Sequence, residues 1–315
     1  MARLVITGGS GFLGSHLCDA FLARGDEVVA VDNLSTGRLQ NLAHLAEQPG
    51  FTFVRADVCD EIPVDGRVDG VLHFASPASP PEYLAVPLET LDVSSLGTRR
   101  ALDLALANDA RFLVASTSEI YGDPDVHPQP ESYNGNVDPG APRAVYDEAK
   151  RFAETLTATY RRLYELPTAI VRIFNTYGPR LRPADGRVVS NFLMQAIDGK
   201  PLTMYGTGNQ TRSFCYVADE VRGILALFDS DVCDPVNIGN PIEITMLELV
   251  DIVRDVTGSS SEVAFEPLPI GDPTRRRPDI TRARTLLGWE PTVALRDGLA
   301  LMRDWCIEER RHGRA

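Results

Sequence analysis

The chain lacks any apolar run long enough to cross a bilayer, and no charged-then-apolar leader precedes its first predicted strand. We therefore expect a cytoplasmic protein without membrane contact. It also lacks an excess of basic residues, because 31 Lys and Arg stand against 44 Asp and Glu, for a formal net charge of −13. This balance argues against nonspecific nucleic-acid binding. It leaves open a local arginine cluster that binds an anionic ligand.

Cysteine and histidine are scarce, with five of each. The cysteines are odd in number and lack the spacing of metal ligands, so we expect reduced thiols, no disulfide framework and no metal site. His73 lies within a predicted strand, where a hydrogen-bonded core residue is expected, and His127 has no predicted role.

A glycine-rich segment follows the first apolar run. Residues 3–7 are typical of a buried strand, residues 8–14 read Gly-Gly-Ser-Gly-Phe-Leu-Gly, and residues 12–24 have helical periodicity. Glycines at this spacing allow a tight turn, close approach of the backbone to a pyrophosphate, and close packing of helix on strand. The free N–H groups of the helix N-terminus favour an anion. The segment predicts a dinucleotide site.

Asp32 ends the next apolar run, residues 28–31. A carboxylate there accepts hydrogen bonds from a ribose diol and repels a 2′-phosphate, so NAD is favoured over NADP. Arg38 could soften this preference, or it could be a solvated surface residue. The predicted cofactor contacts are Gly8, Gly11, Phe12, Leu13, Asp32, Asn33, Thr36, Gly37, Asp57, Val58, Phe74, Ser76, Tyr146, Lys150 and Thr176.

Tyr146 and Lys150 are four positions apart on a long predicted helix, residues 144–166, and so share one of its faces. An ammonium beside a tyrosine stabilises the phenolate, and a base that works near pH 7 needs a pKa shift of about 3 units. Thr117, Ser118 and Glu119 follow another predicted strand, residues 112–115, and Glu119 adds a second acid or base. The set predicts redox chemistry at a carbon that bears oxygen, with a proton transfer nearby.

Strand-like and helix-like segments alternate through the first half of the 315 residues, and the hydrophobic fraction of 43% suffices for a large core. We predict an α/β fold: a Rossmann-type doubly wound parallel sheet with a smaller C-terminal substrate-binding lobe. The NAD-binding domain is expected at residues 1–174 and the lobe at 175–315, with some later segments returning to the first domain. Apolar residues on another face of the helix at 144–166 indicate either core packing or a helix pair across a homodimer.

Several segments resemble the extended short-chain dehydrogenase/reductases over nearly the whole chain. The glycine turn, the Tyr-x-x-x-Lys pair and the region of Asn175 are common to that superfamily. More specific segments resemble the UDP-glucuronic acid decarboxylases, also called UDP-xylose synthases. They are residues 75–81, 116–124, 142–150, 172–180, 185–192 and 277–280.

This resemblance implies NAD-dependent oxidation of UDP-glucuronic acid at C4, loss of carbon dioxide from the resulting 4-keto sugar, and return of hydride. It implies a UDP-sugar as the partner. The implied catalytic residues are Thr117, Ser118, Glu119, Tyr146, Lys150 and Arg276. The implied substrate-binding residues are Asn175, Arg187, Asn191, Tyr205 and Arg212.

One departure leaves the product open. The related synthases commonly have a basic residue and an Asn in the stretch that corresponds to residues 91–98, where this chain has Asp92. The product is therefore UDP-xylose, UDP-4-keto-pentose or both. A nucleotide-sugar 4,6-dehydratase is a rival, although Ser118 stands where such enzymes carry an acidic Asp. A non-catalytic NAD-binding sensor is a third reading, which the intact Tyr146 and Lys150 disfavour.

Overall fold

A seven-stranded parallel sheet forms the centre of the computed structural model, which describes residues 1–267 and 275–312. Its strand order is β11-β6-β5-β4-β1-β2-β3. The strands are β1 (Arg3–Thr7), β2 (Glu27–Asp32), β3 (Phe51–Arg55), β4 (Gly70–His73), β5 (Arg111–Thr117), β6 (Thr168–Ile173) and β11 (Val236–Ile238). The predicted Rossmann-type sheet is thereby confirmed.

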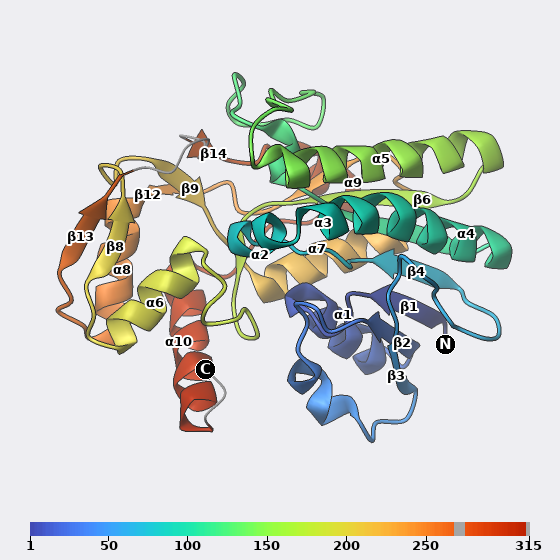
Figure 1. Cartoon of the computed structure of the whole chain (residues 1–315), viewed down its shortest axis with the longest axis horizontal. Coiled ribbons are helices and arrows are strands. Elements are labelled where there is room, and N and C mark those ends of the chain that lie inside the picture. Colours follow the sequence, from blue (N-terminus) through green and yellow to red (C-terminus); the bar gives the residue numbers. More distant parts are fainter. Residues whose placement is uncertain (268–274, 313–315) are drawn as a thin grey trace.

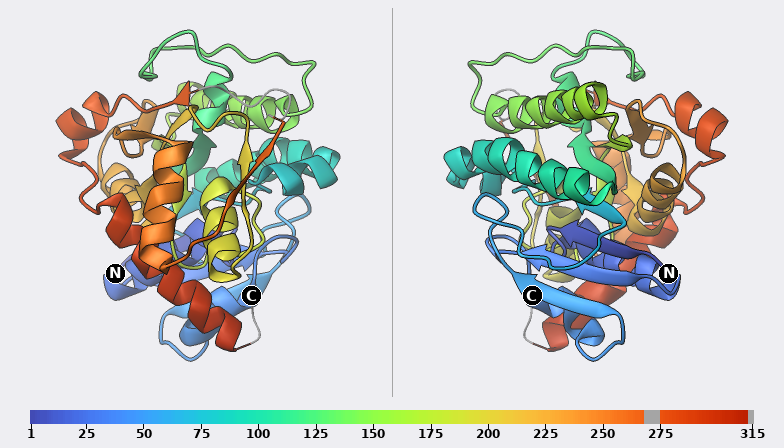
Figure 2. Two further views of the ribbon diagram at one scale, coloured as in Figure 1. Left: turned by 90° about the vertical axis from the view of Figure 1, so that its left-hand side faces the viewer. Right: turned by 90° about the vertical axis from the view of Figure 1, so that its right-hand side faces the viewer.

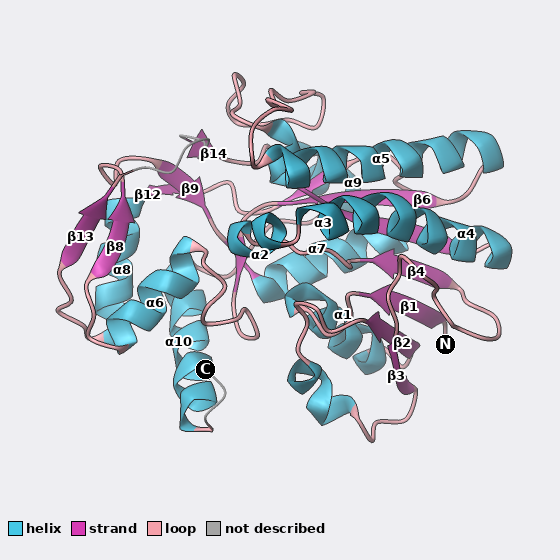
Figure 3. Cartoon of the chain, in the orientation of Figure 1, coloured by secondary structure: helices cyan, strands magenta, loops and turns pink. Residues whose placement is uncertain are grey.

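Helices cover both faces of this sheet (Figures 1 and 3). On one face lie α1 (Phe12–Ala23) and α7 (Val217–Asp229), whose apolar residues join the larger core. On the other lie α4 (Thr98–Asn108) and α5 (Ala144–Tyr164), side by side in the right-hand view of Figure 2. The fully buried parallel strands are accordingly almost continuously apolar.

The second half of the chain builds most of a smaller lobe. Its helices are α6 (Val188–Ile197), α8 (Met246–Thr257) and α10 (Leu295–Arg311), and β8 (Leu202–Tyr205) pairs there with β13 (Val263–Glu266). Three short strands, β12 (Glu243–Thr245), β9 (Thr211–Ser213) and β14 (Arg275–Arg276), form a separate sheet. Strand β11 belongs to the second half of the chain but pairs with β6 in the main sheet.

Short elements connect these layers. They are η1 (Leu39–Leu45), α2 (Pro80–Ala85), α3 (Pro87–Asp92), the π-helical turn η2 (Val93–Gly97), η3 (Ser118–Tyr121), β7 (Thr176–Tyr177), β10 (Cys215–Tyr216) and α9 (Thr281–Leu287). The sequence predicted an extended piece at 212–217, but α7 already begins at Val217. Tyr216 provides no side-chain cap, so the usual signal for a helix start is missing.

Two sequence predictions on single residues are confirmed. Thr245 and Glu248 form a reciprocal capping box at the start of α8. The buried His73 ring bonds to the Thr7 hydroxyl at 2.8 Å, as expected for a core histidine. Within residues 1–267 and 275–312, no helix is long and apolar enough to cross a membrane, and no cluster of His, Cys, Asp or Glu could hold a metal ion.

Candidate active site

A cavity of about 670 Å³ runs from the carboxyl edge of the main sheet to the smaller lobe. Residues of both halves of the chain line it. The predicted site residues on its wall are Gly8, Gly11, Phe12, Leu13, Thr36, Phe74, Ser76, Thr117, Ser118, Glu119, Tyr146, Lys150, Asn175, Thr176, Arg187, Asn191, Tyr205, Arg212 and Arg276. Carboxyl ends of parallel strands meet at one edge of a sheet, which explains why so many of them converge.

The glycine turn between β1 and α1 fits a pyrophosphate. Gly8 has φ +69°, and a Cβ there would lie 2.7 Å from the backbone of Phe74 and Ala75. A Cβ on Gly14 would overlap the Gly8 carbonyl oxygen. In this part of the described chain, α1 has no side-chain cap and no acidic residue in its first turn. Its first N–H groups are therefore left for an anionic ligand.

Asp32 is held in place at the end of β2. One carboxylate oxygen accepts a hydrogen bond from the Ser10 N–H at 3.0 Å, and the other accepts one from the Leu34 N–H at 2.8 Å. A Cβ on Gly37 would lie 2.8 Å from this carboxylate, so only glycine leaves room there. The backbone thus supports the carboxylate that is predicted to meet the ribose.

Five predicted cofactor residues are absent from the wall of the cavity: Asp32, Asn33, Gly37, Asp57 and Val58. They lie together at the ends of β2 and β3, and the Asn33 amide donates to the Asp57 carboxylate at 2.8 Å. These contacts group them around the predicted adenosine end, apart from the catalytic end of the cavity.

The catalytic pair, Tyr146 and Lys150, lies on the wall of the cavity. The Lys150 ammonium donates to the Ala115 carbonyl oxygen at 3.0 Å, and its Nζ is 5.7 Å from the centre of the Tyr146 ring. Burial lowers the pKa of Lys150 to about 8. Burial and the Glu119 carboxylate raise the pKa of Tyr146, whereas Arg187 and a hydrogen bond with Thr117 lower it by less. The sequence predicted that Tyr146 would have a lowered pKa. In the protein chain alone the Tyr146 pKa is raised, so this prediction is wrong.

Glu119 lies between two arginines. Its carboxylate is 3.1 Å from Arg143 Nη2 and 3.6 Å from Arg276 Nη1. Burial opposes ionisation, but the two guanidinium groups outweigh it and hold the Glu119 pKa below its usual value. Glu119 is thus a carboxylate and not the acid that the sequence left open.

Three further residues at this end were not predicted. Arg143 and Asp147 flank Tyr146 at the start of α5, and burial and the Glu119 carboxylate raise the pKa of Asp147 to about 8. Tyr83 of α2 stacks on Tyr146 with ring centres 4.9 Å apart and planes at 2°. The helical spacing of Arg143 and Asp147 around Tyr146 was a usable signal. Nothing local in the sequence places Tyr83 there.

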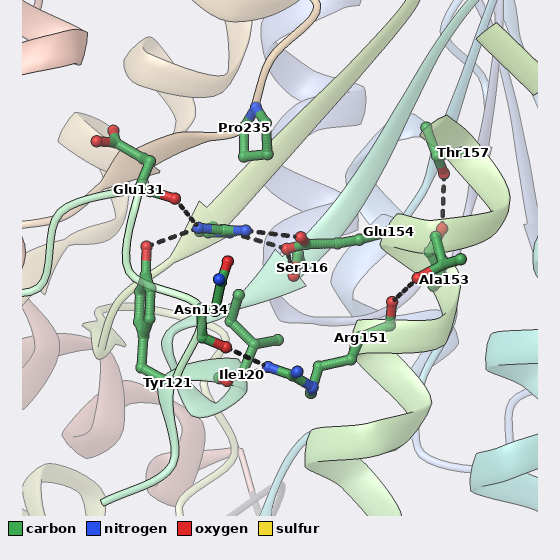
Figure 4. A network of polar contacts seen from close by, with 12 residues as sticks. Ser116, Ile120, Tyr121, Glu131, Asn134, Arg151, Ala153, Glu154, Thr157 and Pro235 are labelled. Atoms are coloured by element: carbon green, nitrogen blue, oxygen red, sulfur yellow. Dashed lines mark hydrogen bonds and ion pairs between the residues drawn. The ribbon is translucent and has the colours of Figure 1, made fainter. Parts of the chain in front are cut away.

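A polar network beneath the cavity supports the turn that carries Glu119. The Ser116 hydroxyl donates to Glu154 at 2.5 Å, and Arg172 contacts the same carboxylate at 2.9 and 2.8 Å. Arg172 also donates to the Tyr121 hydroxyl at 2.9 Å, and Arg151 donates to the Ile120 and Asn134 carbonyl oxygens. Figure 4 shows Arg151 and Glu154 of α5 reaching toward Ser116, Ile120, Tyr121 and Asn134. These contacts hold the end of β5 and the turn η3, which carry Thr117 and Glu119.

Arg212 and Arg276 approach the cavity as a pair. They are partners in the parallel ladder of β9 and β14, so their side chains share one face of that small sheet. Arg276 is buried, and its neighbour Arg275 is exposed. This places one arginine beside Glu119 and a second farther along the same wall.

Other residues of the smaller lobe already have protein partners. The Asn175 and Asn191 amides donate to the carbonyl oxygens of Ser213 and Gly186, at 3.4 and 3.0 Å. Three arginines on the wall are paired with carboxylates, namely Arg180 with Asp19, Arg182 with Glu82, and Arg187 with Asp185. A ligand would have to share or displace these contacts.

Known proteins resemble the chain over nearly its whole length. A model of the NAD dependent epimerase/dehydratase family matches residues 4–239. UDP-glucuronic acid decarboxylase 1 of Arabidopsis thaliana is 50% identical over 300 residues, which cover 95% of this chain and 68% of that protein. UDP-glucuronic acid decarboxylase 1 of Danio rerio is 49% identical over 297 residues, covering 94% and 71%.

Solved structures resemble the fold as well. UDP-glucuronic acid 4-epimerase from Bacillus cereus, solved with UDP-glucuronic acid and NAD, superposes with a TM-score of 0.86 at 28% identity. The match covers 97% of this chain and 99% of that one.

Proposed function

The chain belongs to the NAD dependent epimerase/dehydratase family, and on that premise we propose that it decarboxylates UDP-glucuronic acid. The observation that carries this proposal is Glu119 between Arg143 and Arg276, next to Tyr146 in the same cavity. A tyrosine assisted by a lysine can act as the base in the oxidation of an alcohol, and buried arginines can bind a carboxylate. Relatives at about 50% identity are named for this activity.

NAD is the cofactor, and its predicted contacts run from the glycine turn to Thr176. When bound, it supplies the acceptor, and later the donor, of the hydride at C4 of the sugar. The uncapped N-terminus of α1 would hold its pyrophosphate, and the supported Asp32 carboxylate would hold a ribose diol. Neither the glycine turn nor Asp32 needs to change conformation to bind the pyrophosphate and the ribose diol.

Tyr146 would act as the base that removes the proton of the C4 hydroxyl. As a phenolate it accepts that proton while the carbon is oxidised, and the resulting phenol can donate a hydrogen bond to the new ketone. The Lys150 ammonium, 5.7 Å from the centre of the Tyr146 ring, would stabilise the phenolate. The Thr117 hydroxyl, which lines the same cavity and lowers the pKa of Tyr146, also favours the phenolate.

The 4-ketone lies β to the C6 carboxylate, so the C5–C6 bond can break with its electron pair moving toward the ketone oxygen. Carbon dioxide leaves, an enolate forms, and C5 then takes a proton. Arg276 would bind the carboxylate before it leaves, with Glu119 and Arg143 fixing the guanidinium. Arg212 would bind the diphosphate from the neighbouring strand.

UDP-xylose is the product that we propose. The sequence left early release of a 4-keto-pentose open because this chain loses a basic residue and gains Asp92 in the stretch at residues 91–98. The Asp92 side chain is exposed at the end of α3 and is not on the wall of the cavity. It therefore offers no charge at the catalytic end that would disfavour the final reduction.

Product analysis by mass spectrometry with several nucleotide sugars tests this function. We expect carbon dioxide and UDP-xylose from UDP-glucuronic acid with NAD. Water loss from a nucleotide hexose would assign a dehydratase, and binding without turnover would assign a sensor. UDP-4-keto-pentose as the final product would refute the reduction step alone.

The outer face of α3 and α5 supports a homodimer. Leu88, Phe152 and Leu163 are 70%, 49% and 67% exposed there, beside a hollow of about 780 Å³. Core packing therefore explains the apolar residues of α5 only in part, and a second copy of the chain would cover the remainder.

A further inference from the structure

A buried glutamine holds the chain segment that follows Arg276. Gln129 lies in the loop between η3 and α5, beside residues 277–279, which come directly after β14. Its N–H donates to the Arg277 carbonyl oxygen at 2.9 Å, and its carbonyl oxygen accepts the Asp279 N–H at 3.0 Å. Its side-chain Oε1 accepts the Arg277 N–H at 2.8 Å, and its Nε2 donates to a carbonyl oxygen of its own loop at 2.8 Å. Gln129 is fully buried and thereby clamps the backbone on one side of Arg276.

Asn237 of β11 connects this clamp to η3, the turn that carries Glu119. Its Nδ2 donates to the carbonyl oxygens of Gln129 and Asp279, at 2.9 and 3.1 Å. Its Oδ1 accepts a hydrogen bond at 2.8 Å from the hydroxyl of Tyr121, the last residue of η3. Both Asn237 and Tyr121 are fully buried. One buried amide thus links η3 to the backbone that follows β14.

The Arg276 guanidinium depends on its backbone for its position. Its Nη1 lies 3.6 Å from Glu119, and within the described residues its Nε has no hydrogen-bond partner. Strand β14 has only two residues and lies at the edge of its three-stranded sheet, where Arg276 pairs with Arg212 of β9. This pairing holds one edge of β14, and the Gln129 clamp holds the residues that follow. Because misplacement by about 1 Å can lower a reaction rate by about 100-fold, the clamp matters for a catalytic arginine.

We propose that Gln129 is a positioning residue for Arg276, because its clamp on residues 277–279 sets the guanidinium against Glu119, where it would meet the C6 carboxylate of the sugar. This inference rests on the proposed function. Gln129 is not among the described residues on the wall of the cavity. It therefore acts through Arg276 and not by touching the substrate.

Gln129→Met tests the clamp with a side chain of similar length. Methionine keeps the backbone bonds to residues 277–279 but leaves the Arg277 N–H without its side-chain acceptor. We expect kcat for release of carbon dioxide from UDP-glucuronic acid to fall by about 2- to 12-fold, the range for one hydrogen bond, with little change in KM. The split between kcat and KM is the relevant readout, since it separates a misplaced Arg276 from a general loss of binding.

A double-mutant cycle separates positioning from a merely structural effect. In the Arg276→Ala background, Gln129→Met should cause no further fall in kcat, because no guanidinium remains to be misplaced. A general weakening of the fold would instead lower kcat by the same factor in both backgrounds.

Gln195→Met is the matched control. Gln195 of α6 forms the same kind of double contact, since its Oε1 accepts the Thr203 N–H at 3.0 Å and its Nε2 donates to the Thr203 hydroxyl at 2.9 Å. It supports β8 and not the segment after β14, so the variant should keep the wild-type kcat.

Hydrogen exchange provides a readout that does not depend on activity. The Arg277 amide should exchange faster in Gln129→Met than in the wild-type protein, as measured by mass spectrometry without substrate. Gln129→Asn retains an amide but is one methylene shorter, so it should also lower kcat, and it provides a second test should the methionine variant fail to fold.

Three results would overturn the proposal. They are a wild-type kcat in folded Gln129→Met protein, an equal fall in kcat in the Arg276→Ala background, and unchanged exchange of the Arg277 amide. Release of carbon dioxide by the wild-type enzyme is measured first. Its absence would refute the proposed function, whereas release that is insensitive to Gln129 would refute this inference alone.

Discussion

At the scale of single residues, each ionisable group in the cavity takes its protonation state from burial and from the charges beside it. Burial lowers the pKa of Lys150, and burial with the Glu119 carboxylate raises that of Tyr146. Two arginines hold Glu119 as an anion against its own burial. Tyr146 thus starts as a phenol, and forming its phenolate is a cost that the bound state must offset.

Tyr146→Phe should lower turnover by about 10²- to 10⁴-fold, because the phenolic oxygen is the base. The stack on Tyr83 would remain, so the protein should stay folded and retain NAD. Steady-state kinetics and NAD binding measure the two effects. Tyr160→Phe, on the same helix but bonded to Asp103, is the control that should keep normal turnover. Normal turnover of Tyr146→Phe would contradict its role as the base.

The two cavity arginines should separate binding from chemistry. Arg212→Ala should mainly raise KM, since the diphosphate is held throughout the cycle. Arg276→Ala should mainly lower kcat, since it acts where charge changes. Each effect should be roughly 10- to 150-fold, because charge-assisted hydrogen bonds contribute about 1.5–3 kcal/mol.

Arg275→Ala is the matched control for both arginines. Arg275 is on the same strand as Arg276 but is exposed, so its loss should change neither kinetic constant. An Arg276 variant that behaves like the Arg275 variant would remove Arg276 from the proposed mechanism.

At the scale of elements, the way in which neighbouring backbone segments pack decides which groups of the site lie close together. The β1–α1 turn brings the Gly8 carbonyl so close to Gly14 that no side chain fits between them. The β9–β14 ladder sets Arg212 and Arg276 side by side. Beneath η3, the bonds from Ser116 and Arg172 to Glu154 fix the end of β5 (Figure 4). Each element supplies one component of the site.

Gly14→Ala should disturb the β1–α1 turn, because its Cβ would overlap the Gly8 carbonyl oxygen. We expect a loss of about 1–3 kcal/mol in the free energy of unfolding, typical of overpacking, and weaker NAD binding. Thermal unfolding and NAD titration measure these changes. Gly140→Ala is the control, since its Cβ would approach nothing closer than 3.4 Å. Equal behaviour of the two variants would contradict the close approach.

At the scale of the whole molecule, the site exists only where the two halves of the chain meet. Glu119 and Tyr146 come from elements of the first half, whereas Arg212 and Arg276 come from the smaller lobe. The opposite side of α5 is exposed and apolar at Phe152 and Leu163. One face of α5 thus lines the cavity, and another face would form the contact of the proposed dimer.

Leu163→Glu combined with Phe152→Glu should convert a dimer into single chains of 34.5 kDa, because burying two carboxylates in an apolar interface is unfavourable. Sedimentation equilibrium measures the mass. Leu286→Glu, at a 55% exposed site on α9, is the control that should leave the dimer intact. A wild-type protein of single-chain mass would refute the dimer.

Much of the fold was readable from local patterns. Apolar runs, glycine spacing and capping residues predicted β1, α1, α5 and the capping box of α8, because each depends on residues close in sequence. The start of α7 was missed, since Tyr216 gives no capping signal. The sequence patterns also placed Thr117, Ser118 and Glu119 at the end of a strand.

The sequence by itself determined which groups of the main sheet converge, because parallel strands bring their carboxyl ends to one edge. Only the tertiary structure decided their charge states and partners. The stack of Tyr83 on Tyr146 joins residues far apart in the chain, as does the contact of Arg276 with Glu119. Burial and Coulomb interactions act through space, so the raised pKa values of Tyr146 and Asp147 emerge only when these distant segments pack together.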